Sequence, residues 1–168
     1  MMNNSLASNI FRFIVLLLVQ VTICSRINLL GYINPFIYII FILMYPIKNN
    51  RLLFLLLAFN LGLLVDMFLD SGGVHAGASV FLAFVRPIFL KYAFGALYEN
   101  QTLKFGKLQT NELVIYVSFM TLFHHLTLFS LEFFNITQIL LILKNTLVSS
   151  LFTVSLSILI ILLFKSRK

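Results

Sequence analysis

Charged residues are scarce in this chain, and their scarcity excludes most classes of protein. Only 10% of its 168 residues are Asp, Glu, Lys or Arg, whereas 61% are hydrophobic and 19 are phenylalanine. The mean hydropathy is +1.04. A soluble domain of this size would have too little polar surface to cover so many apolar side chains. The composition therefore indicates an integral membrane protein.

Cysteine is nearly absent, and so are the common catalytic motifs. The single cysteine, Cys24, excludes an internal disulfide and a metal site built from several thiolates. The sequence contains no H-E-x-x-H, no G-x-S-x-G, no Walker loop and no Gly-rich dinucleotide-binding turn. We therefore expect a protein that is not an enzyme, with no catalytic residue, cofactor or metal site.

Six apolar runs predict an all-α, polytopic membrane protein with six transmembrane helices in one domain, residues 1–168. Each run is close to the ~20 residues that cross a hydrocarbon core of ~30 Å. The second run is the shortest, because Pro35 and Pro46 bound it. The six predicted helices are 9–24, 33–47, 52–69, 74–95, 111–131 and 137–164.

The basic residues are distributed unevenly between the two sets of connections. One set carries a single basic residue, Arg26, in the connection 25–32. The other set carries seven, which are Lys48, Arg51, Lys104, Lys107, Lys165, Arg167 and Lys168. The positive-inside rule then predicts that both termini are cytoplasmic. Because the basic residues lie in separate short connections, they do not indicate binding to nucleic acid.

One polar stretch, "GLLVDMFLDSGGVHAGASVFLAFVRP" at 62–87, interrupts the apolar pattern. Asp66 and Asp70 are four residues apart, so they share one face of the third predicted helix. Gly72 and Gly73 permit a tight turn, after which Asp70 or Ser71 can cap the fourth helix. The stretch therefore predicts a helical hairpin with polar groups at its turn.

The fourth predicted helix begins with His75 among small residues. The turn brings His75 near the carboxylates, where a carboxylate–imidazole contact is expected. Gly73 and Gly77 start a small-residue surface that lets helix backbones approach closely in lipid. Two interpretations of this polar hairpin stay open: a structural cap, or a functional role as either a partner-docking edge or a proton-sensitive contact.

A catalytic or metal-binding interpretation of the acidic pair is weaker. Two carboxylates and one histidine could hold a divalent ion, and D-x-x-x-D spacing is found in lipid phosphotransferases of the CDP-alcohol type. Those enzymes also need an upstream Asp-Gly and Ala-Arg framework, which this sequence lacks.

Arg86 lies well inside the fourth predicted helix, where an unpaired charge is costly. It should face the bundle or a polar crevice, or extend toward the cytoplasm beside Lys91. Pro87, next to it, removes a backbone donor and predicts a kink.

The last predicted helix carries a polar seam with a spacing of four residues. The seam suits hydrogen bonds to other helices, and Gln20 and Asn60 are candidate partners. A seam of this kind could also line a cavity. His124 and His125, in the fifth helix, are expected at the membrane interface. The seam comprises Asn145, Ser149, Thr153 and Ser157, with Lys144 at its border.

The hairpin resembles a signature of the MreD family, the rod shape-determining membrane proteins of bacteria. The residues that carry this resemblance are the Gly-Leu-x-x-Asp turn at 62–66 and the "DSGGVHAGASVF" that follows, with "RP" at 86–87. In this form the stretch is similar to MreD of the Bacteroidetes type. The "GYINPFIYIIFILMYP" segment, the chain length and the six predicted helices add to the resemblance.

The resemblance implies a non-enzymatic subunit of the cell-elongation (Rod) complex in the bacterial inner membrane. Such proteins work beside MreC, the actin-like MreB, the glycosyltransferase RodA and a class B penicillin-binding protein. The implied fold is similar to the substrate-binding subunits of energy-coupling-factor transporters. An alternative function is therefore a small-molecule-binding subunit of a vitamin-type transporter, with a pocket that opens outward.

Overall fold

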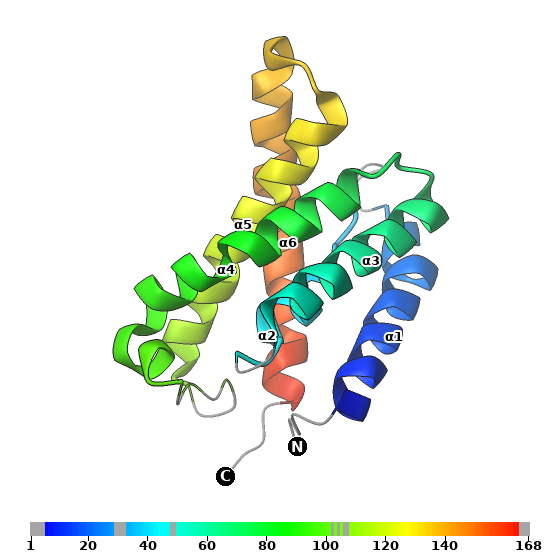
Figure 1. The fold of residues 1–168 in the computed structure, drawn as a ribbon. Helices are drawn as coiled ribbons and strands as arrows, with labels where there is room; N and C mark the ends of the chain where they lie inside the picture. The colour runs from blue at the N-terminus through cyan, green and yellow to red at the C-terminus, as the bar shows by residue number, and fades with distance from the viewer. Residues whose placement is uncertain are drawn as a thin grey trace.

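The computed structural model describes residues 6–28, 33–47, 50–101, 103, 105 and 108–164. Five of its helices are long and apolar enough to cross a membrane, so the chain has the character of a multi-pass membrane protein. Figure 1 shows them as tilted, crossing helices. These five are α1 (Leu6–Thr22), α3 (Arg51–Leu69), α4 (Val74–Glu99), α5 (Thr110–Phe133) and α6 (Ile139–Phe164).

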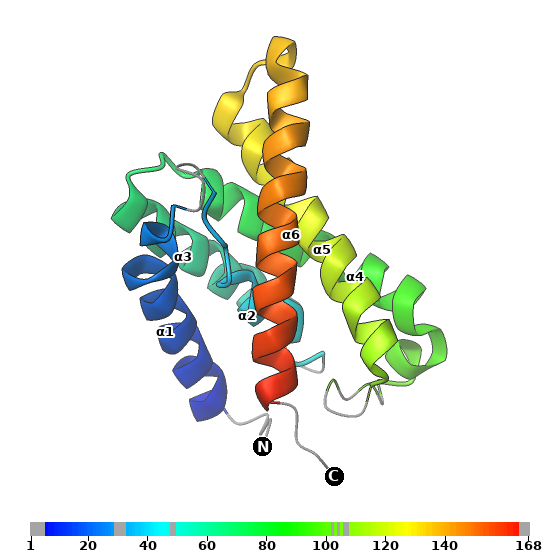
Figure 2. The same ribbon diagram turned by 180° about the vertical axis from the view of Figure 1, so that it is seen from behind.

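The chain passes back and forth between two ends of the bundle. Figures 1 and 2 show the start of α1 and the end of α6 at one end, which we call the terminal end. The turns from α3 to α4 and from α5 to α6 lie at the opposite end, which we call the hairpin end. The α5–α6 turn extends beyond the other helices there. Helix α4 packs between α3 and α5, and α5 packs between α4 and α6.

Segment 33–47 differs from the full transmembrane helix that the sequence predicts. Only α2 (Ile39–Met44), a helix of six residues, forms within it. The backbone before α2 is extended or turned, and Tyr45 after it is extended, with φ −61° and ψ 140°. Residues 35–45 are all buried, so the segment lies inside the bundle rather than against lipid.

This segment still connects the hairpin end to the terminal end. About eight turned or helical residues advance ~1.5–2 Å each, and about seven extended ones advance ~3.3 Å each, which gives a span of roughly 35–39 Å if the segment runs straight. That length is enough for a hydrocarbon core of ~30 Å. The even number of crossings explains why the start of α1 and the end of α6 lie at the same end (Figure 1).

Helices α3 and α4 approach each other most closely at Gly62. A Cβ atom placed on Gly62 would lie 2.4 Å from the backbone oxygen of His75 and 2.6 Å from the Cα of Ala76. Real side chains do not fit at such distances, so only glycine allows this contact. The sequence predicts close packing through Gly73 and Gly77 instead. Gly77 is exposed, and Gly73 serves the turn, with φ 95°.

Helix α4 departs from helical geometry at a different residue from the one predicted. The backbone at Gly95 has φ 44° and ψ −119°, whereas Pro87 lies within regular helix. A φ of about −65° suits both proline and an α-helix, so the proline ring fits while its missing N–H leaves one carbonyl without an intrahelical donor. Glycine alone adopts a positive φ without strain. The bend therefore lies at Gly95, near the terminal end.

The Gly62 contact predicts a strong difference between two Gly→Ala substitutions. Gly62→Ala should destabilise the protein by about 2 kcal/mol or more, because the new methyl meets backbone atoms that cannot move aside. Gly77→Ala is the matched control, since its Cβ would meet only the end of the Leu131 side chain, at 3.1 Å. Thermal unfolding in detergent measures both. Equal unfolding midpoints for the two variants would contradict the assignment of the close contact to Gly62.

Candidate functional site

Asp66 caps the start of α4 from the neighbouring helix. Its Oδ1 accepts hydrogen bonds from the Ser71 hydroxyl at 2.6 Å and the His75 backbone N–H at 3.0 Å. Its Oδ2 accepts one from the Ala76 N–H at 2.8 Å. The first N–H groups of a helix lack intrahelical acceptors and favour negative charge, so a carboxylate stabilises this end. Asp66 is 5% exposed, and both of its oxygens are used.

Asp70 and Ser71, the predicted caps of α4, do not fill that role. Asp70 is exposed, and its backbone, at φ 54°, ends α3 in the left-handed conformation. The Ser71 hydroxyl donates to Asp66 rather than accepting from α4. The predicted contact between a carboxylate and the His75 ring also differs, because Asp66 binds the backbone of His75. Gly72 and Gly73 form the turn with φ values of 68° and 95°.

Tyr38 joins segment 33–47 to α4 and α5. The side chain of this tyrosine is fully buried. Its hydroxyl lies 3.1 Å from His75 Nδ1 and 2.8 Å from His124 Nε2. A hydroxyl donates one hydrogen bond and can accept another, so it can satisfy both imidazoles when they are neutral. His124 and His125 are 0% exposed, which corrects the prediction that they lie at the membrane interface.

A second chain of hydrogen bonds joins segment 33–47 to α5 and α6. The Phe36 N–H donates to Thr153 Oγ1 at 3.1 Å, and Thr153 Oγ1 lies 3.1 Å from His125 Nε2. His125 Nδ1 lies 2.8 Å from the Thr121 carbonyl oxygen, which can only accept. His125 therefore carries its proton on Nδ1, and the Thr153 hydroxyl donates to Nε2. The direction of each bond in the chain follows from this tautomer.

Gln20 of α1 pairs with the same part of the backbone. Its Nε2 donates to the Pro35 carbonyl at 3.2 Å, and its Oε1 accepts from the Tyr38 N–H at 3.4 Å. A side-chain amide thus supplies the donor and the acceptor that a helix would have supplied. The sequence places Gln20 against the seam of α6, whereas the structure places it against Pro35.

Arg86 and Tyr116 complete the other end of α2. Arg86 donates to the carbonyl of Leu43 at 3.1 Å, to that of Tyr45, and to the Tyr116 hydroxyl at 3.2 Å. Tyr116 in turn donates to the Leu43 carbonyl at 3.1 Å. The last carbonyls of a helix lack intrahelical donors and favour positive charge. Arg86, at 4% exposure, therefore pairs with backbone rather than with a carboxylate.

Aromatic rings surround the Arg86 guanidinium. Its carbon lies 5.2 Å from the centre of the Phe54 ring and 5.8 Å from that of Phe105. Cation–π contacts of this kind are worth more when the cation is desolvated. Of the alternatives that the sequence leaves open for Arg86, the structure shows the one in which it faces the bundle.

The predicted polar seam of α6 is only partly used. Thr153 forms hydrogen bonds, Ser149 and Ser157 are buried, and Asn145 is half-buried. Lys144 is exposed near the hairpin end. Asn60, a predicted partner of the seam, is exposed and donates to the Leu56 carbonyl of its own helix.

Sequence reasoning missed Tyr38 and Tyr116 of the hydrogen-bond network, and it named Gly62 in the signature without its packing role. A signal for the tyrosines was present, because Pro35 and Pro46 bound a run too short for a full helix. A broken backbone at membrane depth needs side-chain partners. Buried polar residues on the other helices were therefore candidates for that role.

The arrangement of the buried polar side chains indicates a structural role more directly than a catalytic one. Each of Asp66, His75, Arg86 and His125 is buried and hydrogen-bonded within the bundle. Among the residues that the structure describes, no group of three or more His, Cys, Asp or Glu side chains could hold a metal ion. No family model, curated protein or solved structure matches this chain.

The Asp66 cap predicts a graded response to substitution. Asp66→Ala should destabilise the protein by about 1–3 kcal/mol, because it leaves two buried N–H groups without an acceptor. Asp66→Asn should lose less, since one oxygen remains. Asp70→Asn is the control, because Asp70 is exposed and asparagine tolerates its left-handed backbone. Thermal unfolding in detergent measures this order, and an Asp70→Asn loss as large as that of Asp66→Ala would contradict it.

Proposed function

We propose that this chain is a non-enzymatic, MreD-type membrane subunit of the bacterial cell-elongation complex. It would lie in the inner membrane with both termini in the cytoplasm. Its role would be to hold MreC, and with it RodA, a class B penicillin-binding protein and MreB, in one assembly. The observation that carries the proposal is the structural use of the Gly-Leu-x-x-Asp turn, which the sequence shares with the MreD pattern.

Both ends of that turn act on the same contact. Gly62 lets α3 approach the backbone of His75 and Ala76. Asp66, one helical turn later on the same face, binds the N–H groups of those two residues. The turn thus fixes one helical hairpin rather than presenting a reactive group. This use favours assembly over catalysis.

A groove between α5 and α6 offers a site for a partner helix. It has a volume of about 360 Å³. Ser150, in the groove, is 5% exposed, and its Oγ has no hydrogen-bond partner among the described residues. A hydroxyl in hydrocarbon gains from a partner, and small or polar residues favour helix association. We assign this groove to the transmembrane helix of MreC. Its lining residues are Ser118, Phe119, Leu122, Leu147, Ser150, Leu151 and Val154.

The proposed function is tested first by depletion and co-purification. Rod-shaped cells depleted of this protein should become round, because the elongation enzymes would no longer be held together. MreC, identified by mass spectrometry, should co-purify with the protein from native membranes. Unchanged cell shape together with an intact elongation complex would contradict the proposal. Tight binding of a vitamin-like molecule and co-purification of an ATPase would point to the transporter alternative instead.

The groove is tested by two tryptophan substitutions on α6. Leu151→Trp should reduce recovery of MreC by about fivefold or more, because it fills the centre of the proposed contact. Leu159→Trp is the matched control, since both leucines are exposed, at 73% and 55%, and only Leu151 lines the groove. Equal recovery of MreC with the two variants would place the partner elsewhere. Such a result would contradict the assignment of the groove but not the proposed function, which the depletion experiment tests separately.

A further inference from the structure

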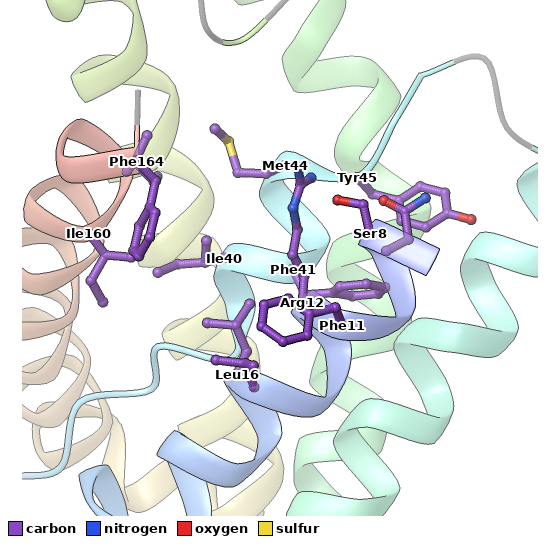
Figure 3. Close-up of a pocket in the computed structure, with 13 residues that line it drawn as sticks. Ser8, Phe11, Arg12, Leu16, Ile40, Phe41, Met44, Tyr45, Ile160 and Phe164 are labelled. Carbon is purple, nitrogen blue, oxygen red and sulfur yellow. The ribbon is translucent and has the colours of Figure 1, made fainter. Parts of the chain in front are cut away.

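A second cavity lies at the terminal end, among α1, α2 and α6. Its volume is about 280 Å³. Figure 3 shows the Arg12 side chain extending toward the Ser8 and Met44 part of this pocket, with Leu16 in the opposite direction. Two of its lining residues, Phe11 and Phe164, are 68% and 75% exposed, so the pocket is accessible from outside the bundle. None of the polar network around Tyr38 lines it.

Asn9 gives this pocket a polar side chain. The residue is 6% exposed and lines the cavity. A carboxamide nitrogen donates hydrogen bonds, and such a donor in hydrocarbon gains from an acceptor. A ligand that carries oxygen atoms at this position can accept a hydrogen bond from Asn9.

Arg12 gives the pocket a positive charge that no acidic side chain balances. It lies seven residues into α1 counting from Leu6, or about 9 Å from the start of the helix. The chain has only five acidic residues, Asp66, Asp70, Glu99, Glu112 and Glu132. Of these, Glu99 forms a salt bridge, and its partner is Lys91, 3.1 Å away. None of these five acidic side chains forms a salt bridge with Arg12 in the part of the chain that the structure describes.

Most of the other lining residues are apolar, and the combination of a polar end with an apolar surface indicates the class of ligand. Leu16, Ile40 and Ile160 form a surface suited to an acyl chain. A guanidinium and a carboxamide at one end suit phosphate and ester oxygens. Because residues 1–65 and 133–168 contain no Asp or Glu, the pocket belongs to a part of the chain with an unopposed positive charge. That charge favours a lipid with a net negative charge over a zwitterionic one.

We propose that the pocket among α1, α2 and α6 binds one anionic phospholipid. Arg12 and Asn9 hold its phosphate and ester oxygens, and one acyl chain lies along Leu16, Ile40 and Ile160. The lipid then fills the space between α1 and α6, which do not pack closely against each other. The site is independent of the groove proposed for MreC, because no residue lines both.

The site is tested by native mass spectrometry of the full chain in a neutral detergent. The probes are phosphatidylglycerol and phosphatidylcholine with identical acyl chains. The wild-type protein should retain one phosphatidylglycerol, with a preference of about fivefold or more over phosphatidylcholine. Arg12→Gln should abolish the preference. Arg51→Gln, which removes an exposed cation that does not line the pocket, should keep it.

Two further variants test the lipid site independently of Arg12→Gln. Ile160→Trp should lower retention of both lipids, because the indole fills the path of the acyl chain. Asn9→Leu should weaken binding of phosphatidylglycerol even if Arg12→Gln fails to fold in lipid-free detergent. If Arg51→Gln lost the preference for phosphatidylglycerol as fully as Arg12→Gln, the preference would come from the overall surface charge. That result would overturn the proposed site. Undiminished lipid retention in Ile160→Trp would place the lipid elsewhere and overturn it as well.

Discussion

The structure depends on one constraint: backbone N–H and C=O groups in hydrocarbon must find partners within the protein. The five long helices meet most of this constraint by themselves, and Asp66 supplies the acceptors at the start of α4. Segment 33–47 does not, because its helix has only six residues. Polar side chains from four other helices supply the missing partners. They are Gln20 of α1, Arg86 of α4, Tyr116 of α5 and Thr153 of α6.

The same constraint explains why so many polar residues occur in such an apolar chain. Asp66 and Arg86 act at helix ends, where their charges match the free N–H and C=O groups. Tyr38 and Thr153 hold three histidines in defined positions. A polar group used in this way is not available to a substrate. The network therefore gives the bundle a single arrangement of its helices and leaves partner binding to the outer surface and to the two cavities.

Much of this fold follows from the sequence, because hydropathy and helix length are local properties. The ends of the five long helices lie within about four residues of their predicted positions, and the turn at Gly72 and Gly73 is where the glycines place it. The details that were wrong depend on tertiary contacts. Asp66 rather than Asp70 caps α4 because it faces that helix, and spacing alone does not distinguish the two carboxylates.

The burial of His124 and His125 is another detail that depends on tertiary contacts and could not be predicted from the sequence. His124 and His125 are next to each other, so they point about 100° apart on a helix. On a peripheral helix one of them would face lipid. Both are buried because α5 lies between α4, α6 and segment 33–47. The central place of α5 cannot be read from its own sequence.

Segment 33–47 also imposes an order on biosynthesis. The long helices can each insert as they are made, since each is stable in a membrane alone. The segment is made second, but the residues that complete it come from α4, α5 and α6, which are made later. Until Thr153 has entered the membrane, the Phe36 N–H lacks its acceptor. The early part of the chain must therefore wait for the last helix before it can reach its final position.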